Sequence, residues 1–279
     1  MRTVFKLVFL VSAITSLFCV VPAQQLSAEQ IIAKHLDSIG PADKRALLKT
    51  MLMGGRSEFE TKTPVVKGGG KAIVVSDPEN LYLMMSFNSK EYPFEKVGAF
   101  GSKVSLPFVT AGSRSMLGSF LSEHSKILLD NLFGGATSLR WIHNIAANKK
   151  LKAAGMRKID GHQAFVVDVP MNTGSDDFKV KLFFDAETFH HIRSEYHREV
   201  PVGQLAFGRQ NQLANAQLDL TEVFSDFKDV EGLTLPHSYT VTFVSNSTVQ
   251  IYENSWGIRS GSYLFNQKLA PGFFSFEGK

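Results

Sequence analysis

Apolar residues recur with two different periods along this chain, and together the periods predict a mainly β protein of the α+β class. From residue 56 onward, runs rich in Val, Leu, Phe and Tyr are interrupted by Gly, Pro, Asp and Asn at intervals of roughly 8 to 12 residues. That spacing is typical of antiparallel strands joined by hairpins. Near residues 27–39 and 113–145 the apolar positions instead repeat at three, four and seven, which is the helical period.

The first helix is expected directly after Ser27. Ser27 and Gln30 have the spacing of a capping box, in which each side chain bonds the backbone of the other. Ile32, Leu36 and Ile39 form one apolar stripe, and Gly40 followed by proline ends the helix. We expect this helix to lie across a sheet, with one or two further helical turns over residues 42–50.

Roughly ten strands are expected on either side of a central helical insert. Turns are placed at residues 67–70, where Lys67 precedes three glycines, and at 77–80, 185–187, 229–232 and 245–247. The expected strands are 56–66, 71–75, 81–87, one or two within 92–103, 163–169, 178–184, 188–200, 217–227, 233–244 and 248–256.

The helical insert spans about residues 113–148 and has an apolar stripe. The stripe includes Leu117, Phe120, Leu121 and Leu128, and the glycine pair at 134–135 stops the helix before a second short helix through 139–145. Such a stripe usually marks a helix packed permanently on a sheet. The alternative is the inner face of a mobile lid.

Residues 1–23 are expected to be a secretion signal that is removed. Arg2 and Lys6 precede an apolar run over 7–21, and small residues around Ala23 suit cleavage after that residue. The alternative, an uncut anchor, is disfavoured because spanning a bilayer takes roughly 20 apolar residues. We therefore expect an exported, periplasmic protein without a stable membrane span after processing.

The single cysteine, Cys19, lies inside this signal. Acylation is not expected, because Phe18 and Ser16 stand where a lipoprotein signal has a small residue and usually leucine. The processed chain would keep 256 residues (279 less 23) and no thiol, which excludes disulfides and sulfur ligands. Loss of Arg2 and Lys6 lowers the formal charge from +4 to +2, and no basic block indicates nucleic acid binding.

The sequence offers no set of residues for catalysis or metal binding. His190 and His191 are neighbours on an expected strand and so face opposite ways, while His197 is roughly 20 Å from His191 along a straight strand. No G-x-S-x-G motif occurs, and S-x-x-K at 225–228 falls on a strand, where positions three apart face opposite ways. We expect no enzyme activity, no metal and no cofactor.

Phenylalanine is the compositional oddity, with 23 residues against six tyrosines and two tryptophans. On alternating strands such as 180–184, residues like Phe183 could line a ligand cavity. The alternative is an ordinary packed core, because phenylalanine is normally buried. Collectively, and under a helical cover, an apolar cavity is as well supported as a packed core.

Four stretches together resemble the outer-membrane lipoprotein-sorting and lipoprotein-localisation (LolA/LolB-like) superfamily, and in particular members of uncharacterised function. They are the helix 27–40, the early strand pair, the hairpin segment 182–188 and the hairpin segment 226–237. The resemblance covers most of residues 24–279, which we treat as one domain. It implies an unclosed antiparallel β-barrel whose concave face is apolar and covered by helices.

In characterised carriers of this superfamily the concave face receives acyl chains. The resemblance thus implies a non-enzymatic periplasmic carrier or binding protein for a lipid or an acylated protein. The candidate cavity or lid residues are Leu117, Phe120, Leu121, Leu128 and Phe183. The alternative is a structural or partner-binding envelope protein that takes no small-molecule ligand and binds another envelope protein.

Overall fold

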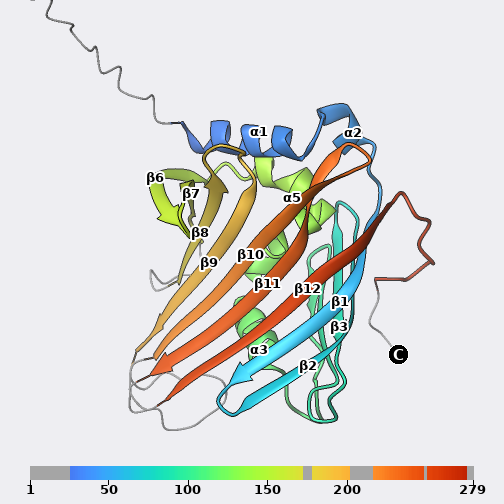
Figure 1. Cartoon of the computed structure of the whole chain (residues 1–279), viewed down its shortest axis with the longest axis vertical. Helices are drawn as coiled ribbons and strands as arrows, with labels where there is room; N and C mark the ends of the chain where they lie inside the picture. Colours follow the sequence, from blue (N-terminus) through green and yellow to red (C-terminus); the bar gives the residue numbers. More distant parts are fainter. Residues whose placement is uncertain (1–25, 172–177, 202–215, 248–249, 275–279) are drawn as a thin grey trace, which may run out of the picture.

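A computed structural model describes residues 26–171, 178–201, 216–247 and 250–274, and its main feature is one antiparallel sheet of twelve strands (Figure 1). The predicted signal peptide and Cys19 lie outside the described residues. The spatial order is β5-β4-β3-β2-β1-β12-β11-β10-β9-β8-β7-β6, so β5 and β6 are edges and the sheet does not close. The strands are β1 (Met51–Lys62), β2 (Val65–Ser76), β3 (Asn80–Ser86), β4 (Phe94–Phe100), β5 (Lys103–Ser105), β6 (Lys152–Ile159), β7 (His162–Val169), β8 (Phe178–Asp185), β9 (His191–Val200), β10 (Ala216–Val230), β11 (Leu233–Ser247) and β12 (Ile251–Phe265).

The helices cover one end and the concave face of this curved sheet. Helix α1 crosses the end of the strands, and α3 and α5 lie behind them (Figure 1). The helical elements are α1 (Ala28–Ile39), α2 (Ala42–Ala46), α3 (Met116–Glu123), α4 (Lys126–Leu129), the 3-10 turn η1 (Gly135–Thr137), α5 (Leu139–Asn144) and the 3-10 turn η2 (Ile145–Ala147). Among the described residues, none of these helices has the length and apolarity to span a bilayer.

Helix α1 forms as its sequence predicts. Ser27 Oγ accepts the backbone N–H of Gln30, and the Gln30 side chain accepts the N–H of Ser27 at 2.9 Å, which completes the capping box. The apolar stripe of Ile32 and Ile39 is buried, each residue being 2% exposed. The helix therefore closes one end of the core, because its apolar stripe must be buried against another element.

The glycine run at 68–70 does not form the turn that the sequence predicts. The turn is at Thr63–Pro64, and the glycines lie inside β2. A side chain at Gly68 would meet the ring of Phe59 at 2.2 Å, and one at Gly70 would meet the carbonyl oxygen of Ser86 at 2.2 Å. These glycines are therefore needed for close approach within the sheet.

The strand count also differs from the expected ten, chiefly because β6 is absent from the prediction. Its sequence, with Ala153, Gly155 and Met156, lacks the β-branched alternation that marks a strand. The register of β6 against β7 shifts between Ala153 and Met156, and this shift is a β-bulge at the edge of the sheet. The predicted turn at 229–232 is confirmed, since Glu231 and Gly232, with φ of 55° and 81°, join β10 to β11.

Replacing Gly70 by alanine is expected to destabilise the fold. The new methyl group would meet a backbone oxygen that cannot rotate away, so we expect a loss of about 1–3 kcal/mol in the free energy of unfolding. Urea denaturation of the processed chain measures it. Gly261→Ala is the matched control, because its methyl group would meet only Gly54 O at 3.9 Å. Equal stability of the two variants would contradict the prediction.

Candidate functional site

The contact between the helical insert, residues 116–147, and the concave face of the sheet is the candidate site. Four of the five residues singled out from the sequence meet there. Leu117, Phe120, Leu121 and Leu128 are each at most 1% exposed and belong to one core with the inward residues of the sheet. The Phe120 ring, for example, lies 5.4 Å from that of Phe243 on β11. In this structure the concave face is therefore filled by the chain's own side chains.

The fifth residue, Phe183, is not part of this contact. On β8 its neighbours Leu182 and Phe184 face the main core, so strand alternation turns Phe183 to the outer face. There it forms a small separate cluster with Ala164 and Val166. Strand β6 curls over this cluster, and the Arg157 guanidinium lies 5.6 Å from the Phe183 ring centre.

The insert is fastened to the sheet by buried polar groups that sequence reasoning did not single out. Glu222 on β10 is fully buried, and its carboxyl group is 2.6 Å from the hydroxyls of both Tyr196 and Tyr239 on the adjacent strands. It also accepts the backbone N–H of Gly134 at 2.8 Å. The Tyr196 hydroxyl is in turn 3.1 Å from the carbonyl oxygen of Leu132. One carboxyl group and its tyrosines thus hold the connection between α4 and η1, at Leu132 and Gly134.

This geometry favours a protonated Glu222. The Tyr196 hydroxyl has one proton but lies near two oxygens, Leu132 O and Glu222 Oε2. Both contacts are hydrogen bonds only when Glu222 Oε2 carries the second proton. Burial acts in the same direction and raises the pKa of Glu222 to about 7, although the tyrosines and Gly134 N–H lower it.

A second buried carboxyl group, Glu95 on β4, lies beside the start of α3. Its side chain contacts the Tyr92 hydroxyl, which accepts the indole N–H of Trp256 at 2.6 Å. Burial raises the pKa of Glu95 to about 7, while hydrogen bonds from Ser115 and Tyr92 lower it. Ser115 also caps α3 by accepting the N–H of Gly118 at 2.8 Å. Glu95 therefore marks the end of the insert opposite to α5.

Buried histidines join the insert to α1 and β9. The indole N–H of Trp141 on α5 donates to His35 Nε2 at 2.9 Å, so the His35 proton is on Nδ1, 3.0 Å from Phe189 O. Burial lowers the pKa of His35 to about 3 and that of His191 well below its usual value. His191 stacks on Trp141 with ring centres 4.4 Å apart. Both rings are neutral packing elements rather than proton donors at neutral pH.

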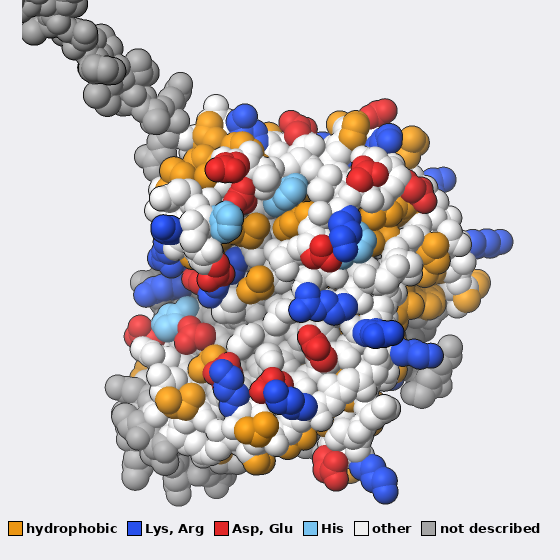
Figure 2. Space-filling view, viewed as in Figure 1, with side chains coloured by type: hydrophobic (Ala, Val, Ile, Leu, Met, Phe, Trp, Pro, Cys, Tyr) orange, Lys and Arg blue, Asp and Glu red, His pale blue; other side chains and the backbone are white. Residues whose placement is uncertain are grey.

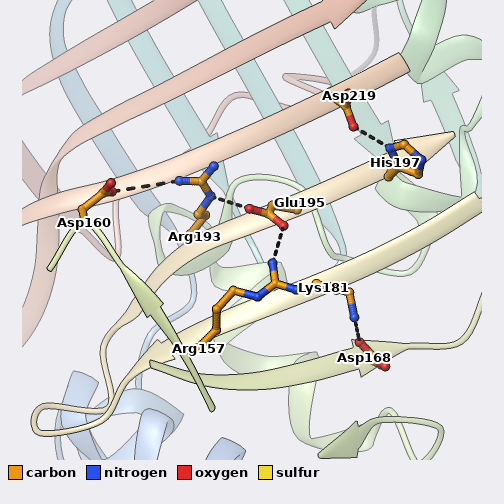
Figure 3. A network of polar contacts seen from close by, with 8 residues as sticks. All are labelled: Arg157, Asp160, Asp168, Lys181, Arg193, Glu195, His197 and Asp219. Atoms are coloured by element: carbon orange, nitrogen blue, oxygen red, sulfur yellow. Dashed lines mark hydrogen bonds and ion pairs between the residues drawn. The ribbon is translucent and has the colours of Figure 1, made fainter. Parts of the chain in front are cut away.

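The outer face of the sheet carries ion pairs instead of a binding constellation (Figure 3). His197 lies 2.6 Å from Asp219, and Glu195 lies 2.8 Å from Arg193 and 3.7 Å from Arg157. Positive and negative side chains are interspersed over this face (Figure 2), an arrangement that contributes little stability per pair. Among the described residues, no three His, Cys, Asp or Glu side chains come together as metal ligands.

Four cavities that we describe all lie outside the contact between insert and sheet. Two lie on the outer face beside Arg193, with volumes of about 390 and 410 Å³. One of about 330 Å³ lies between α1 and η2, and one of about 760 Å³ lies beneath residues 269–274. None of the four is lined by Glu222, Glu95 or the four apolar insert residues. Among the described residues, the insert thus separates these four cavities from the concave face.

Solved structures similar to this chain include a lipoprotein-sorting domain. That domain, assigned as an outer-membrane lipoprotein-sorting protein of Vibrio parahaemolyticus, is 10% identical, with a TM-score of 0.45 over 87% of this chain and 97% of that one. A DUF1329 family protein from Desulfovibrio piger is 11% identical, with a TM-score of 0.42 over 88% and 97%. The structure of the Pseudomonas aeruginosa MucA/MucB complex is 7% identical, with a TM-score of 0.23 over 86% of this chain and 99% of that one.

No protein-family model matches the sequence, and no curated protein matches it significantly. Because the identities and TM-scores of the similar structures are low, no residue role and no ligand is taken from them.

The two buried carboxyl groups predict a specific dependence of stability on pH. Their pKa values are raised in the folded state from 4.5 to about 7, so the folded protein binds more protons than the unfolded chain between these values. Each group should therefore lower the stability as pH rises through this window, by about 1–3 kcal/mol. The buried His35 and His191, whose pKa values are lowered, make the protein more stable as pH rises toward their unfolded pKa. This contribution is the same in the native chain and in the carboxyl variants, so it cancels in the difference between them.

Glu222→Gln isolates the effect of one carboxyl group. Relative to the native chain, its free energy of unfolding should increase steadily between about pH 5 and pH 8, by the same 1–3 kcal/mol. Urea denaturation across this range measures the difference. The exposed Glu91→Gln serves as the control and should show no trend. A flat difference for Glu222→Gln would show that the group is ionised in the folded protein throughout.

Proposed function

We propose that this chain is an exported, non-enzymatic carrier or binding protein for a lipid or lipidated protein, and that the ligand's acyl chains replace the helical insert on the concave face. The observation that carries the proposal is the kind of cover on that face. The insert consists of helices of eight, four and six residues rather than a second sheet. Helices this short are not stable alone, so their order depends on the apolar surface they cover.

The burial energy of the four apolar insert residues singled out from the sequence is comparable to that of one acyl chain. Burying Leu117, Phe120, Leu121 and Leu128 contributes about 6–12 kcal/mol, at about 1.5–3 kcal/mol for each side chain. An acyl chain of about 12 methylene groups contributes about 10 kcal/mol when it enters the same surroundings. The insert buries further large side chains, among them Phe133, Leu139 and Trp141, so a single acyl chain offsets the loss of only part of its contacts.

Buried polar groups would give the exchange its specificity. Glu222 and Tyr196 contact the insert through its backbone, at Gly134 N–H and Leu132 C=O. A lipidated protein presents amide groups of the same kind beside its acyl chains, so these side chains have replacement partners when the insert leaves. Phe183, which faces the other side of the sheet, has no part in this site.

The filled concave face favours a second candidate, a structural or partner-binding envelope protein without a small-molecule ligand. In this case the insert is a permanent part of the core, as apolar helical stripes usually are. The two functions differ in whether the insert must leave the sheet, so an experiment that prevents its movement separates them.

A cross-link between insert and sheet provides this test. Met116 Sδ on α3 lies 3.3 Å from Asn254 Nδ2 on β12, so cysteines at both positions can be joined by a short bis-maleimide. The processed chain would contain no competing thiol. We expect the unlinked double variant to bind a fluorescent diacylated lipopeptide and the cross-linked form to bind it at least tenfold more weakly.

Each single-cysteine variant treated with the same reagent is the control and should bind like the native chain. Equal binding by the linked and unlinked forms would place the ligand elsewhere than the concave face. Absence of binding in every form, together with recovery of one stoichiometric protein partner from envelope extracts, would instead favour the second candidate.

A further inference from the structure

The chain leaves the sheet after β12 and folds back beside the start of β1 (Figure 1). Its return is fixed by hydrogen bonds rather than by regular structure. Asn266 N–H donates to Thr50 O at 2.9 Å, and Lys49 N–H donates to Asn266 Oδ1 at 2.8 Å. Thr50 Oγ1 donates to Gln267 O at 2.8 Å. The segment that follows, residues 267–274, is thus tethered at its base and lies over the β3–β5 side of the sheet.

Two aromatic residues near the end of this segment face rings of the sheet. Phe273 lies 5.7 Å from Tyr82 on β3, and Phe274 lies 6.0 Å from Phe100 on β4. Yet Phe273 is still 37% exposed, so these rings do not complete a closed core. Neighbouring apolar side chains that stay partly exposed can line a ligand pocket.

The space between them is the cavity of about 760 Å³, the largest of the four described here. Its apolar lining includes Phe100, Val104, Leu269, Phe273 and Phe274. A volume of this size lies within the range of roughly 300–1,000 Å³ that small-molecule sites occupy. The pocket is already open in this structure, whereas the concave face is filled.

The charged groups at this pocket are not equally available. Asp77 lines it, but one of its oxygens already accepts the backbone N–H groups of Glu79 and Asn80 at 2.8 and 2.7 Å. The amide of Asn80 also donates to this carboxylate at 2.9 Å. Lys103 lines the same pocket and forms no ion pair with any described residue. The Asp77 carboxylate is therefore held by neutral donors, while the Lys103 ammonium group is available to an anionic ligand.

We propose that the pocket beneath residues 267–274 binds a single-chain anionic amphiphile of the fatty-acid class. The alkyl chain lies between the phenylalanine rings, and the carboxylate pairs with the Lys103 ammonium group. A chain with an ionised head matches both the apolar walls and Lys103, the one cation among the described residues that line the pocket. This site is separate from the concave face and does not depend on movement of the insert.

The test uses the processed full chain and dodecanoate as the probe, with binding measured by isothermal titration calorimetry. Lys103→Gln should weaken dodecanoate binding by about three- to tenfold, because it removes the pairing charge. Binding of dodecanol, which has no charge, should be unchanged. Lys268→Gln is the matched control, since this lysine is on the same segment but outside the pocket lining, and it should bind both probes like the native chain.

The apolar walls are tested by removal and by filling. The double variant Phe273→Ala/Phe274→Ala should bind dodecanoate at least tenfold more weakly. Leu269→Trp should also weaken binding, by filling the pocket, while its melting temperature stays at or above the native value. Loss of binding in Leu269→Trp without loss of stability separates a filled pocket from a misfolded protein.

The covalent link between residues 116 and 254 distinguishes this site from the concave face. The cross-linked protein should bind dodecanoate like the unlinked form, whatever happens to the lipopeptide. Binding that disappears on cross-linking and is indifferent to the substitutions at 103, 269, 273 and 274 would overturn the proposal. So would the absence of dodecanoate binding by the native chain.

Discussion

An open, strongly curved sheet has an apolar concave face that must be covered, and most of this structure follows from that constraint. A closed barrel would bury the face against itself, and a sandwich would cover it with a second sheet. Here the twelve strands form neither a closed barrel nor a sandwich. The concave face is covered instead by a series of short helices inserted between β5 and β6. Because the inserted helices are too short to be stable alone, cover and sheet depend on each other.

The cover is also attached by polar groups in places where an apolar contact would be simpler. Glu95 is buried beside the start of the insert and Glu222 beside its middle, and removing a carboxyl group from water is costly even when it is hydrogen-bonded. An apolar residue at Glu222 alone would leave the Gly134 N–H unpaired, so the closed form would become more stable only if the whole polar network were replaced by apolar groups. Carboxyl groups there hold the insert in one register while leaving the closed form less stable than it could be. That combination suits a cover that is displaced and then returns to the same place.

The sequence is informative where local chemistry decides the structure. The capping box at Ser27, the turn at Glu231–Gly232 and the burial of the stripe at Leu117 and Phe120 all follow from spacing and residue type. It misleads where a distant contact decides, as at Gly70, which resembles a turn residue but is required by the approach of Ser86. The insert also breaks between α3 and α4 at residues 124–125, which no local signal marks.

The candidate site was only partly visible for the same reason. The helical spacing of the apolar insert residues predicts their burial. For Phe183, strand alternation shows only which residues lie on the same face of the sheet, not which of the two faces is the concave one. Glu222 did carry a signal, since it interrupts the inward series Leu218, Leu220 and Phe224 on one strand. A charged residue at an inward position of a strand is a reason to expect a buried polar contact. Its partners Gly134 and Tyr196, however, are brought to it only by the fold.

Strand β6 has a consequence for the behaviour of the protein at high concentration. An open sheet leaves two rows of unpaired backbone groups, and such edges can add strands from other molecules. β5 has only three residues, which is too short to serve as a template. β6 has a bulge at Ala153–Met156, and Arg157 reaches across two strands to Glu195, which bends the edge over the outer face. The sheet can therefore remain open at high protein concentration without seeding edge-to-edge aggregation.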